Sequence, residues 1–204
     1  MKVFYLKLIY FYIYTKMLLE YIWIDGDGSL RSKTKVVNDS KYDMNNELGS
    51  APEWNYDGSS TRQASGNDSE VLIRPVAIYK DPFRSRSRLV LCDTWLPDGK
   101  PHPTNTRHRA LQLFNQAREL KPMFGIEQEF FLSYNGTPVG YKDSDKTRPQ
   151  GDYYCGIGAD NAIGRECIEE AFDNCLRAGL NLTGMNAEVA PSQWEFQVCA
   201  IGID

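Results

Sequence analysis

Hydrophobic and polar residues alternate with a period of two in several short segments of the first half of the chain. Residues 21–24, the turn Asp25-Gly-Asp-Gly28 and residues 30–37 have the pattern of two strands joined by a glycine-rich turn, which predicts a β-hairpin. Residues 71–79 and 89–93 predict two further short strands. This part of the chain therefore predicts a small β-rich domain.

Helix-breaking and helix-capping residues concentrate in the segment 97–105, which is the predicted domain boundary. After it, apolar residues at helical spacing predict a helix from about Arg107 that Pro122 ends, and a second from about Arg165 with Gly179 in its C-cap region. Extended segments follow each helix, so strand and helix alternate. The apolar positions are Leu111, Phe114, Ala117 and Leu120 in the first helix and Ile168, Ala171, Phe172, Cys175 and Leu176 in the second.

The segment 124–131, Phe-Gly-Ile-Glu-Gln-Glu-Phe-Phe, has the pattern of a strand that carries two carboxylates. Side chains alternate in a strand, so Glu127 and Glu129 point to one face while Ile126 and Gln128 point to the other. Two buried like charges are costly without a partner. The pattern therefore predicts either a cation between the carboxylates or a face that is open to water.

A second acidic pair is predicted in the hairpin 186–198. With Pro191-Ser192 as the turn, Val189 would lie opposite Trp194 and Glu188 directly opposite Glu195. The apolar face would carry Ala187, Val189, Trp194, Phe196 and Val198, and the polar face Asn186, Glu188, Gln193, Glu195 and Gln197.

Four glutamates on two strand faces leave two interpretations open. Like charges across a ladder destabilise it, so the faces are either exposed to solvent or neutralised by a bound cation. Four carboxylates without a neighbouring histidine or thiol would favour a hard divalent cation, Mg²⁺ or Mn²⁺.

The charge balance argues against a nucleic-acid partner. The net charge of −4 and an isoelectric point of about 5.3 provide no basic field, and the only basic run, Arg84-Ser-Arg86-Ser-Arg88, is interpreted as a solvated loop. The five cysteines form no C-x-x-C pair, so they are interpreted as packing residues of a protein in a reducing compartment, the cytoplasm.

Residues 1–17 are interpreted as an N-terminal extension that the fold does not need. Their apolar run is too short and too interrupted for a membrane span, and it lacks the features of a signal peptide. A composition rich in Phe, Tyr, Ile, Lys and Leu is also typical of translated AT-rich sequence, so an error in the gene boundary stays an alternative.

Three other motifs carry little specific chemistry. The run Asp25-Gly-Asp-Gly28 lacks the glutamate that a calcium loop needs, because Val36 stands there, and the Gly-x-Gly at 156–158 is not a dinucleotide loop. The segment 54–61 has the composition of an ordered binding loop, with a plain turn as the alternative.

Several motifs in register resemble the eukaryotic-type glutamine synthetases over about residues 20–198. Motifs of this length in the same order are far more specific together than any one alone. They are Trp54-Asn-Tyr-Asp-Gly-Ser-Ser-Thr, Asp81-Pro-Phe-Arg, Arg88-Leu-Val-Leu-Cys, Phe124-Gly-Ile-Glu-Gln-Glu, Tyr153-Tyr-Cys-Gly-Ile-Gly-Ala-Asp and Asn186-Ala-Glu-Val-Ala-Pro-Ser-Gln-Trp-Glu-Phe-Gln.

The resemblance implies an α+β fold in two domains. Residues 18–98 would form a β-grasp domain, and residues 99–204 the beginning of an α/β catalytic domain, truncated at its C-terminal side. It also implies a homo-oligomer of stacked rings in the cytoplasm, with active sites between neighbouring subunits and no role for a membrane.

The reaction implied by the resemblance is the ATP-dependent ligation of ammonia to glutamate. The γ-carboxylate would take the terminal phosphate of ATP, and ammonia would then displace phosphate from γ-glutamyl phosphate, with Mg²⁺ or Mn²⁺ shielding the charges. By position, Glu129, Glu188 and Glu195 resemble ligands of one metal and Glu127 a ligand of the second. The ammonium-site residues would be Asp57, Ser60 and Tyr154, and the nucleotide-site residues Glu195, Phe196 and Gln197.

Two departures from the family concern the nucleotide contacts: Met123 stands where the family commonly has Trp, and Cys199 replaces a glycine. The family's second half, which supplies further ligands, has no counterpart here, so the 204-residue chain alone is expected to be inactive. A non-catalytic homologue that acts as a structural or regulatory assembly partner is the alternative. Another metal-dependent carboxylate ligase, using a different amine, also stays open.

Overall fold

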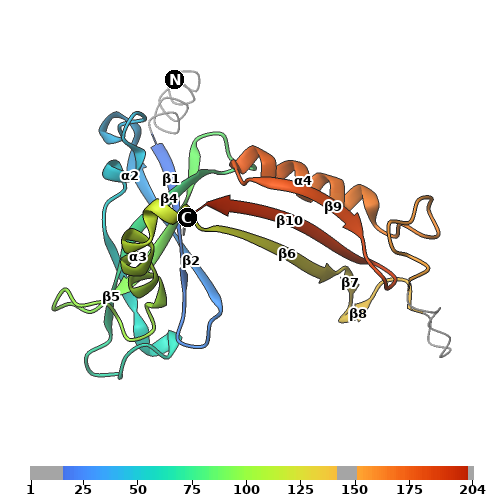
Figure 1. Cartoon of the computed structure of the whole chain (residues 1–204). Helices are drawn as coiled ribbons and strands as arrows, with labels where there is room; N and C mark the ends of the chain where they lie inside the picture. The colour runs from blue at the N-terminus through green and yellow to red at the C-terminus, as the bar shows by residue number, and fades with distance from the viewer. Residues whose placement is uncertain (1–15, 142–150, 202–204) are drawn as a thin grey trace, which may run out of the picture. The chain divides into compact units, whose positions relative to one another are not determined.

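The computed structural model describes residues 16–141 and 151–201, which fall into two compact units that are considered separately (Figure 1). The first unit comprises the described residues up to 118, and the second those from 119 onward. The predicted extension 1–17 lies outside the described residues apart from Lys16 and Met17, which begin the first strand. The predicted domain boundary at 98/99 stays a prediction.

A five-stranded mixed sheet forms the body of the first unit. Its strand order is β2-β1-β5-β4-β3, with β1 and β5 parallel and the other neighbours antiparallel. The predicted hairpin and both predicted strands are confirmed, each with longer bounds than the pattern indicated. The strands are β1 (Lys16–Ile24), β2 (Leu30–Asn38), β3 (Trp54–Asp57), β4 (Glu70–Lys80) and β5 (Ser87–Trp95).

The helices of the first unit are short. The predicted helix from Arg107 is confirmed as α3 (Thr106–Gln116), where the Asn105 side chain accepts a hydrogen bond from the His108 N–H at 3.0 Å. It ends well before Pro122, and a 3₁₀ turn follows. The remaining elements are η1 (Asp39–Lys41), α2 (Glu47–Ser50), η2 (Gly58–Thr61) and η3 (Arg118–Leu120).

Strand β1 supplies the centre of the hydrophobic core of this unit. Its side chains alternate between the two faces, so Met17, Leu19, Tyr21 and Trp23 are all buried together. The Tyr21 ring meets the Trp54 ring edge-on at 5.5 Å between centroids. Aromatic burial of this kind is the main stabilising contribution to a small β domain.

Strand β2, at one edge of the sheet, points charged residues toward this core. Lys33 and Lys35 lie opposite Tyr21 and Leu19, and the Lys33 ammonium lies 3.6 Å from the centroid of the Trp54 ring on β3. Because β2 and β3 are opposite ends of the strand order, this contact shows that the sheet curls until its edges approach. Inward-pointing charges on an edge strand also discourage pairing with another chain.

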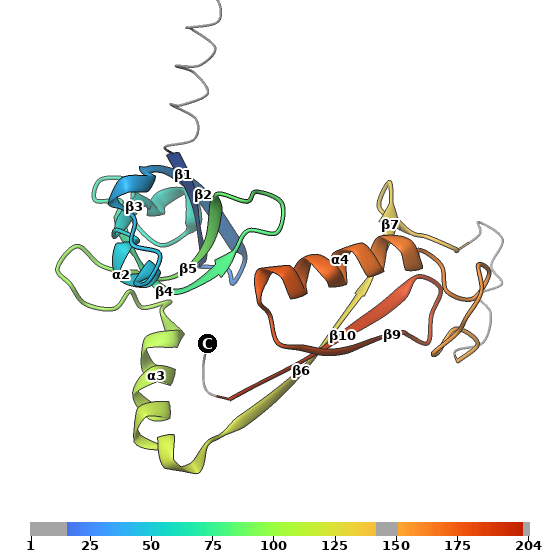
Figure 2. The same cartoon turned by 90° about the horizontal axis from the view of Figure 1, so that it is seen from above.

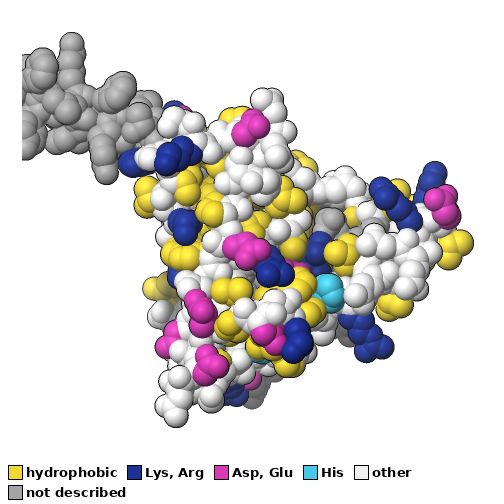
Figure 3. All heavy atoms as spheres, turned by 90° about the vertical axis from the view of Figure 1, so that its left-hand side faces the viewer, with side chains coloured by type: hydrophobic (Ala, Val, Ile, Leu, Met, Phe, Trp, Pro, Cys, Tyr) yellow, Lys and Arg dark blue, Asp and Glu magenta, His cyan; other side chains and the backbone are white. Residues whose placement is uncertain are grey.

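The interpretation of the arginine run as a solvated loop is wrong for Arg88, whereas Arg84 and Arg86 lie in the loop between β4 and β5 with partly exposed side chains. Arg88 lies in β5 and is buried, because its guanidinium forms an ion pair with Glu47, with Nε to Oε2 at 2.7 Å. Its neighbours Arg84 and Arg86 also contact carboxylates, those of Asp81 and Asp39. Positive and negative side chains are interspersed over the face drawn in Figure 3.

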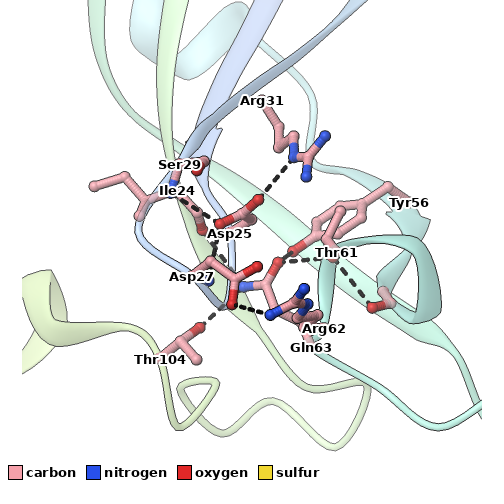
Figure 4. A network of polar contacts seen from close by, with 11 residues as sticks. Ile24, Asp25, Asp27, Ser29, Arg31, Tyr56, Thr61, Arg62, Gln63 and Thr104 are labelled. Atoms are coloured by element: carbon pink, nitrogen blue, oxygen red, sulfur yellow. Dashed lines mark hydrogen bonds and ion pairs between the residues drawn. The ribbon is translucent and has the colours of Figure 1, made fainter.

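The turn between β1 and β2 is organised by the buried carboxylate of Asp25 (Figure 4). It accepts hydrogen bonds from the N–H groups of Asp27 and Ser29, each at 2.9 Å, and from Arg31 Nε at 2.7 Å. These bonds, that from Arg31 foremost, lower the pKa of Asp25. The carboxylate therefore has a structural role in closing the hairpin.

A second polar network connects η2 with the segment before α3. The Gln63 carboxamide oxygen accepts hydrogen bonds from Tyr56 Oη and from Thr61 Oγ1, the latter at 3.0 Å, and its nitrogen donates to Thr104 Oγ1 at 2.9 Å (Figure 4). Gln63 is almost fully buried, so each of these bonds replaces one lost to water.

The second unit is a three-stranded antiparallel sheet, in the order β6-β10-β9, with helix α4 against one face (Figure 2). The predicted second helix is confirmed, and Gly179 ends it at φ +97° in the left-handed region that glycine favours. The elements are β6 (Met123–Phe131), β9 (Leu182–Ala187), β10 (Gln193–Ile201) and α4 (Arg165–Ala178), with a small hairpin of β7 (Ser133–Tyr134) and β8 (Thr137–Pro138).

The core between sheet and helix is built on β10. Trp194 is fully buried and its Nε1 donates to the carbonyl of Ile163 at 2.9 Å, while the Phe196 ring meets those of Phe130 and Phe172 edge-on. Of the predicted helix face, Ile168, Phe172 and Cys175 belong to this core, whereas Ala171 and Leu176 are exposed. The α+β fold class is thus confirmed.

Four of the five cysteines divide into two groups, and the fifth, Cys199, is partly exposed on β10. Cys92 is buried in the first core and Cys175 packs against the second, as predicted for packing residues, but Cys155 and Cys167 are exposed, and for them the prediction is wrong. In the described part of the chain, none of the helices combines the length and the apolar character needed to cross a membrane.

We expect the substitution Asp25→Asn to lower the urea midpoint of unfolding near neutral pH, because the ion pair with Arg31 is lost. The folded-state pKa of Asp25 is below its ordinary value of 3.8, so its stabilisation is present above that value and is lost as pH falls through the lowered pKa. The difference between the two proteins should therefore shrink on acidification.

Asp27→Asn is the matched control, because the Asp27 carboxylate forms its ion pair with an exposed arginine, Arg62. Equal midpoints for the Asp25 variant and the unmodified chain near neutral pH would show that the buried carboxylate does not stabilise the turn.

Candidate functional site

The face of the second sheet that points away from α4 carries the predicted acidic residues. In the register of β6 and β10, Glu129 lies opposite Glu195 and Glu127 lies opposite Gln197. Glu127 and Glu129 therefore share one face, as predicted, and Glu195 lies on that same face. We call this surface the acidic face.

The predicted register of the second hairpin, with Glu188 opposite Glu195, is wrong by two residues. Asn186 lies opposite Glu195, and the Glu188 N–H donates to the carbonyl of Gln193 at 2.8 Å. The connection is a four-residue loop, 189–192, instead of the predicted two-residue turn. A shift of two residues keeps every side chain of a strand on the same face, so the predicted faces are retained.

Glu188 and Glu195 are buried and lie close together at the end of the hairpin. Their exposed fractions are 8% and 6%. Burial raises the pKa of Glu188, and the neighbouring Glu195 carboxylate raises it further, while hydrogen bonds from the Val189 N–H and from Asn186 act in the opposite direction. Two carboxylates in contact repel each other, so this pair is suited to holding a cation between them.

Each of three carboxylates accepts a hydrogen bond from a neighbouring carboxamide. Hydrogen-bonded in this way, a carboxylate keeps a fixed orientation. The pattern of alternating residues placed these amides on the polar face but gave no sign that they contact the glutamates. The pairs are Asn186 with Glu188 at 2.9 Å, Gln193 with Glu129 at 2.7 Å, and Gln197 with Glu195.

Tyr154 lies in the loop that precedes α4, next to the acidic face. The loop is held to the sheet by the Cys155 N–H, which donates to the carbonyl of Ala187 at 2.9 Å. The exposed phenol has a raised pKa, chiefly through the adjacent Cys155 and, to a smaller extent, through Glu188 and Glu195. The predicted ammonium-site residue is thus near two of the predicted metal ligands.

Phe196 does not share the acidic face. Its ring is buried in the core, against Phe130 and Phe172, because alternation along β10 directs it toward α4. The predicted nucleotide contact of this residue can therefore involve only its backbone.

Asp57 and Ser60 belong to the first unit, which is considered separately from the acidic face. Both are exposed, and Asp57 Oδ1 accepts hydrogen bonds from the Ser59 Oγ at 2.6 Å and from the Ser59 N–H at 3.0 Å. These bonds lower the pKa of Asp57, the side-chain bond most strongly. The carboxylate is therefore a stable anion on the surface.

Within residues 16–141 and 151–201, no group of three or more His, Cys, Asp or Glu side chains is close enough to hold a metal ion. The donor set nevertheless fits a hard divalent cation, because Glu188 and Glu195 are buried against each other and Glu129 lies opposite Glu195. Oxygen donors of this kind suit Mg²⁺ or Mn²⁺.

Comparisons with known proteins identify the relatives of this chain. A glutamine synthetase from Hebeloma cylindrosporum is 49% identical over 185 residues, which is 90% of this chain and 51% of that protein. The cytosolic isozyme 2 of glutamine synthetase from Vitis vinifera is 49% identical over 195 residues, 92% of this chain and 54% of that protein. The resemblance to glutamine synthetases is confirmed.

This chain spans about half the length of these glutamine synthetases. A chloroplastic glutamine synthetase from Daucus carota is 48% identical over 93% of this chain, so the relatives come from more than one compartment. A search with models of known protein families finds no match.

Among solved structures, the GmaS/ADP complex in its conformation 1 has a TM-score of 0.65 and 19% sequence identity. The match covers 90% of this chain and 42% of that chain. At this level of identity the likeness shows the fold alone, and it agrees with a partial domain of the glutamine synthetase type.

Both departures from the glutamine synthetase motifs lie on strands of the second unit's sheet, which carries the acidic face. Met123 begins β6 and is 64% exposed, and Cys199 lies on β10 opposite Gly125. Cys199 points to the same face as Glu195 and is partly exposed, so its thiol would change contacts on that face.

We expect Glu188→Gln to stabilise the chain in the absence of divalent cations by about 0.5–1 kcal/mol. The substitution removes a buried like-charge contact, and an amide nitrogen in place of Oε2 gives up the 3.2 Å bond from the Val189 N–H in exchange for a donor to Glu195. Urea unfolding in a chelating buffer measures the effect, and added Mg²⁺ should reduce the difference, because only the unmodified pair attracts the cation.

The exposed Glu170 on α4 provides the control, since Glu170→Gln should change neither measurement. A Glu188→Gln protein that is less stable than the unmodified chain under both conditions would show that the two carboxylates do not oppose each other.

Proposed function

We propose that this chain forms part of an enzyme that ligates ammonia to glutamate with ATP, through γ-glutamyl phosphate. Identity of 47–49% to glutamine synthetases over most of the chain supports the assignment. The observation that carries it is the acidic face, where Glu129 and Glu195 lie opposite each other and Glu188 is buried beside them.

In this proposal the glutamates serve two cations. Glu129, Glu188 and Glu195 would hold one, and Glu127 would contribute to a second whose other ligands come from the half of the enzyme that this chain does not match. Bound Mg²⁺ or Mn²⁺ would shield the negative charge of ATP and of the substrate carboxylate, which otherwise repel each other.

The protein's own groups would hold the reactants and keep water away. The core residues Trp194 and Phe196 fix β10, so Glu195 and Gln197 keep their positions on the opposite face. Tyr154 would contribute to the ammonium site next to Glu188, with which its phenol interacts.

Asp57 and Ser60 are proposed for the ammonium site of a neighbouring subunit in a homo-oligomer of stacked rings. Asp57 is an exposed anion whose lowered pKa keeps it ionised, so it can attract ammonium. The lowered pKa also makes it a weak base, so accepting the ammonium proton would require a higher pKa of Asp57 in the assembled site. For the location of the protein we propose the cytoplasm, on the basis of the unpaired cysteines and the cytosolic relative from Vitis vinifera.

A chimera tests the proposal. In it, this chain replaces the matching half of the Vitis vinifera isozyme, and glutamine formation from glutamate, ammonium, ATP and Mg²⁺ is measured. We expect activity, and we expect Glu195→Ala to lower the rate by about a hundred-fold or more, because electrostatic stabilisation of the transferring phosphoryl group is lost.

Glu170→Ala, on the exposed side of α4, should leave the rate of the chimera unchanged. A folded chimera without activity would favour the alternative, a non-catalytic assembly partner. An active chimera that tolerates Glu195→Ala would remove Glu195 from the metal ligands, and one that prefers another amine would indicate a different carboxylate ligase.

The 204-residue chain alone is expected to form no measurable glutamine under the same conditions. In the glutamine synthetases that it resembles, further ligands of the second cation and the groups that bind phosphate belong to the second half. Glutamine synthesis by the isolated chain, abolished by Glu195→Ala, would show that the first half carries a complete site.

A further inference from the structure

Two carboxamides link the buried glutamates of the acidic face into one network. Gln197 Nε2 donates to Glu195 Oε1 and also to Asn186 Oδ1, the latter at 2.6 Å. Asn186 Nδ2 in turn donates to Glu188 Oε1 at 2.9 Å. A continuous path of hydrogen bonds therefore connects Glu195 on β10 with Glu188 at the end of β9.

The chemistry of the groups fixes the direction of every bond in this network. Ionised carboxylates only accept hydrogen bonds, so both amides must present nitrogen to the glutamates. Gln197 uses both hydrogens of its amide nitrogen, one on Glu195 and one on Asn186. The oxygen of Asn186 is then occupied, so its nitrogen faces Glu188, and neither amide can flip without losing bonds to a carboxylate.

Gly184 provides the space in which the Gln197 carboxamide lies. The two residues are opposite each other on β9 and β10. A Cβ atom at position 184 would be 2.4 Å from Gln197 Oε1, which is closer than such atoms can approach. The atom in the way is the end of a flexible side chain, so alanine there would displace the amide and leave the sheet intact.

We propose that Asn186 and Gln197 are positioning residues that hold Glu188 and Glu195 together for a divalent cation, with Gly184 reserving the place of Gln197. The inference rests on the proposed function. It also changes the role of Gln197, whose amide hydrogens are both used within the acidic face, so its carboxamide oxygen alone is left for a nucleotide.

The physical reason is preorganisation. Without the amides, two carboxylates that repel each other would separate into different rotamers, and a cation would have to bring them back at a cost in entropy. Partners that orient metal ligands commonly change metal affinity by about 10–100-fold.

The experiment uses Mn²⁺ as the probe and the 204-residue chain labelled with ¹⁵N. The affinity for Mn²⁺ is measured from the paramagnetic broadening of backbone amide signals of β9 and β10. We expect Gly184→Ala to weaken Mn²⁺ binding about tenfold or more. Gln197→Met, which keeps the length of the side chain but removes its donors, should have the same effect.

Gly125→Ala on β6 is the matched control, because a Cβ atom there would meet nothing within 4 Å, and its Mn²⁺ affinity should equal that of the unmodified chain. If Gly184→Ala fails to fold, Gln197→Met still provides the comparison.

The side-chain NH₂ signals of Asn186 and Gln197 provide a readout that is independent of the metal. In the unmodified chain these signals should be protected from exchange with water, and in Gly184→Ala those of Gln197 should lose this protection. Unprotected signals in the unmodified chain, or equal Mn²⁺ affinity in all variants, would overturn the positioning role. Protected signals without Mn²⁺ broadening would instead overturn the proposed cation site.

Discussion

The alternation of side chains along β10 is the constraint on which the second unit depends. Trp194 and Phe196 enter the core under α4, and this fixes Glu195 and Gln197 on the opposite face. A shift of this strand by one residue would direct the Glu195 carboxylate into the apolar core under α4 and the Trp194 indole to the opposite face, so hydrophobic packing and the position of the acidic residues are determined together. The acidic face thus owes its geometry to the stability of the core behind it.

The first unit depends on a different constraint, because the edges of its small sheet approach each other. The core aromatic residues of β1 meet Trp54 on β3, and Lys33 on the edge strand β2 lies over the same indole ring. Two buried polar side chains hold the connecting segments of this unit in place: Asp25 in the hairpin turn, and Gln63 between η2 and the segment before α3. Each is satisfied by several donors or acceptors, as buried polar groups must be.

Most of the strands, the two longer helices and the shared face of Glu127 and Glu129 follow from local periodicity, so the sequence predicts them well. Strand β3 is an exception, because the sequence predicts a binding loop or a turn at residues 54–57, and it does not predict the short strands β7 and β8. The register of the second hairpin cannot be predicted from periodicity. Pro191-Ser192 resembles a two-residue turn, but the loop has four residues and the backbone of Ser192 is left-handed, at φ +55°. The burial of Arg88 and the amide network around Glu188 depend on partners distant in sequence. No periodic pattern contains that information.

Strand β6 has a neighbour on one side only among the described strands, and it exposes Phe124 and Ile126. A free strand edge with apolar side chains is a template for pairing with another chain. Glu127 and Glu129 lie on this edge strand, where their charges act as gatekeepers against a second copy of the same strand. A divalent cation that neutralised them would remove this protection, so the ions suited to the acidic face would also promote self-association of the exposed edge.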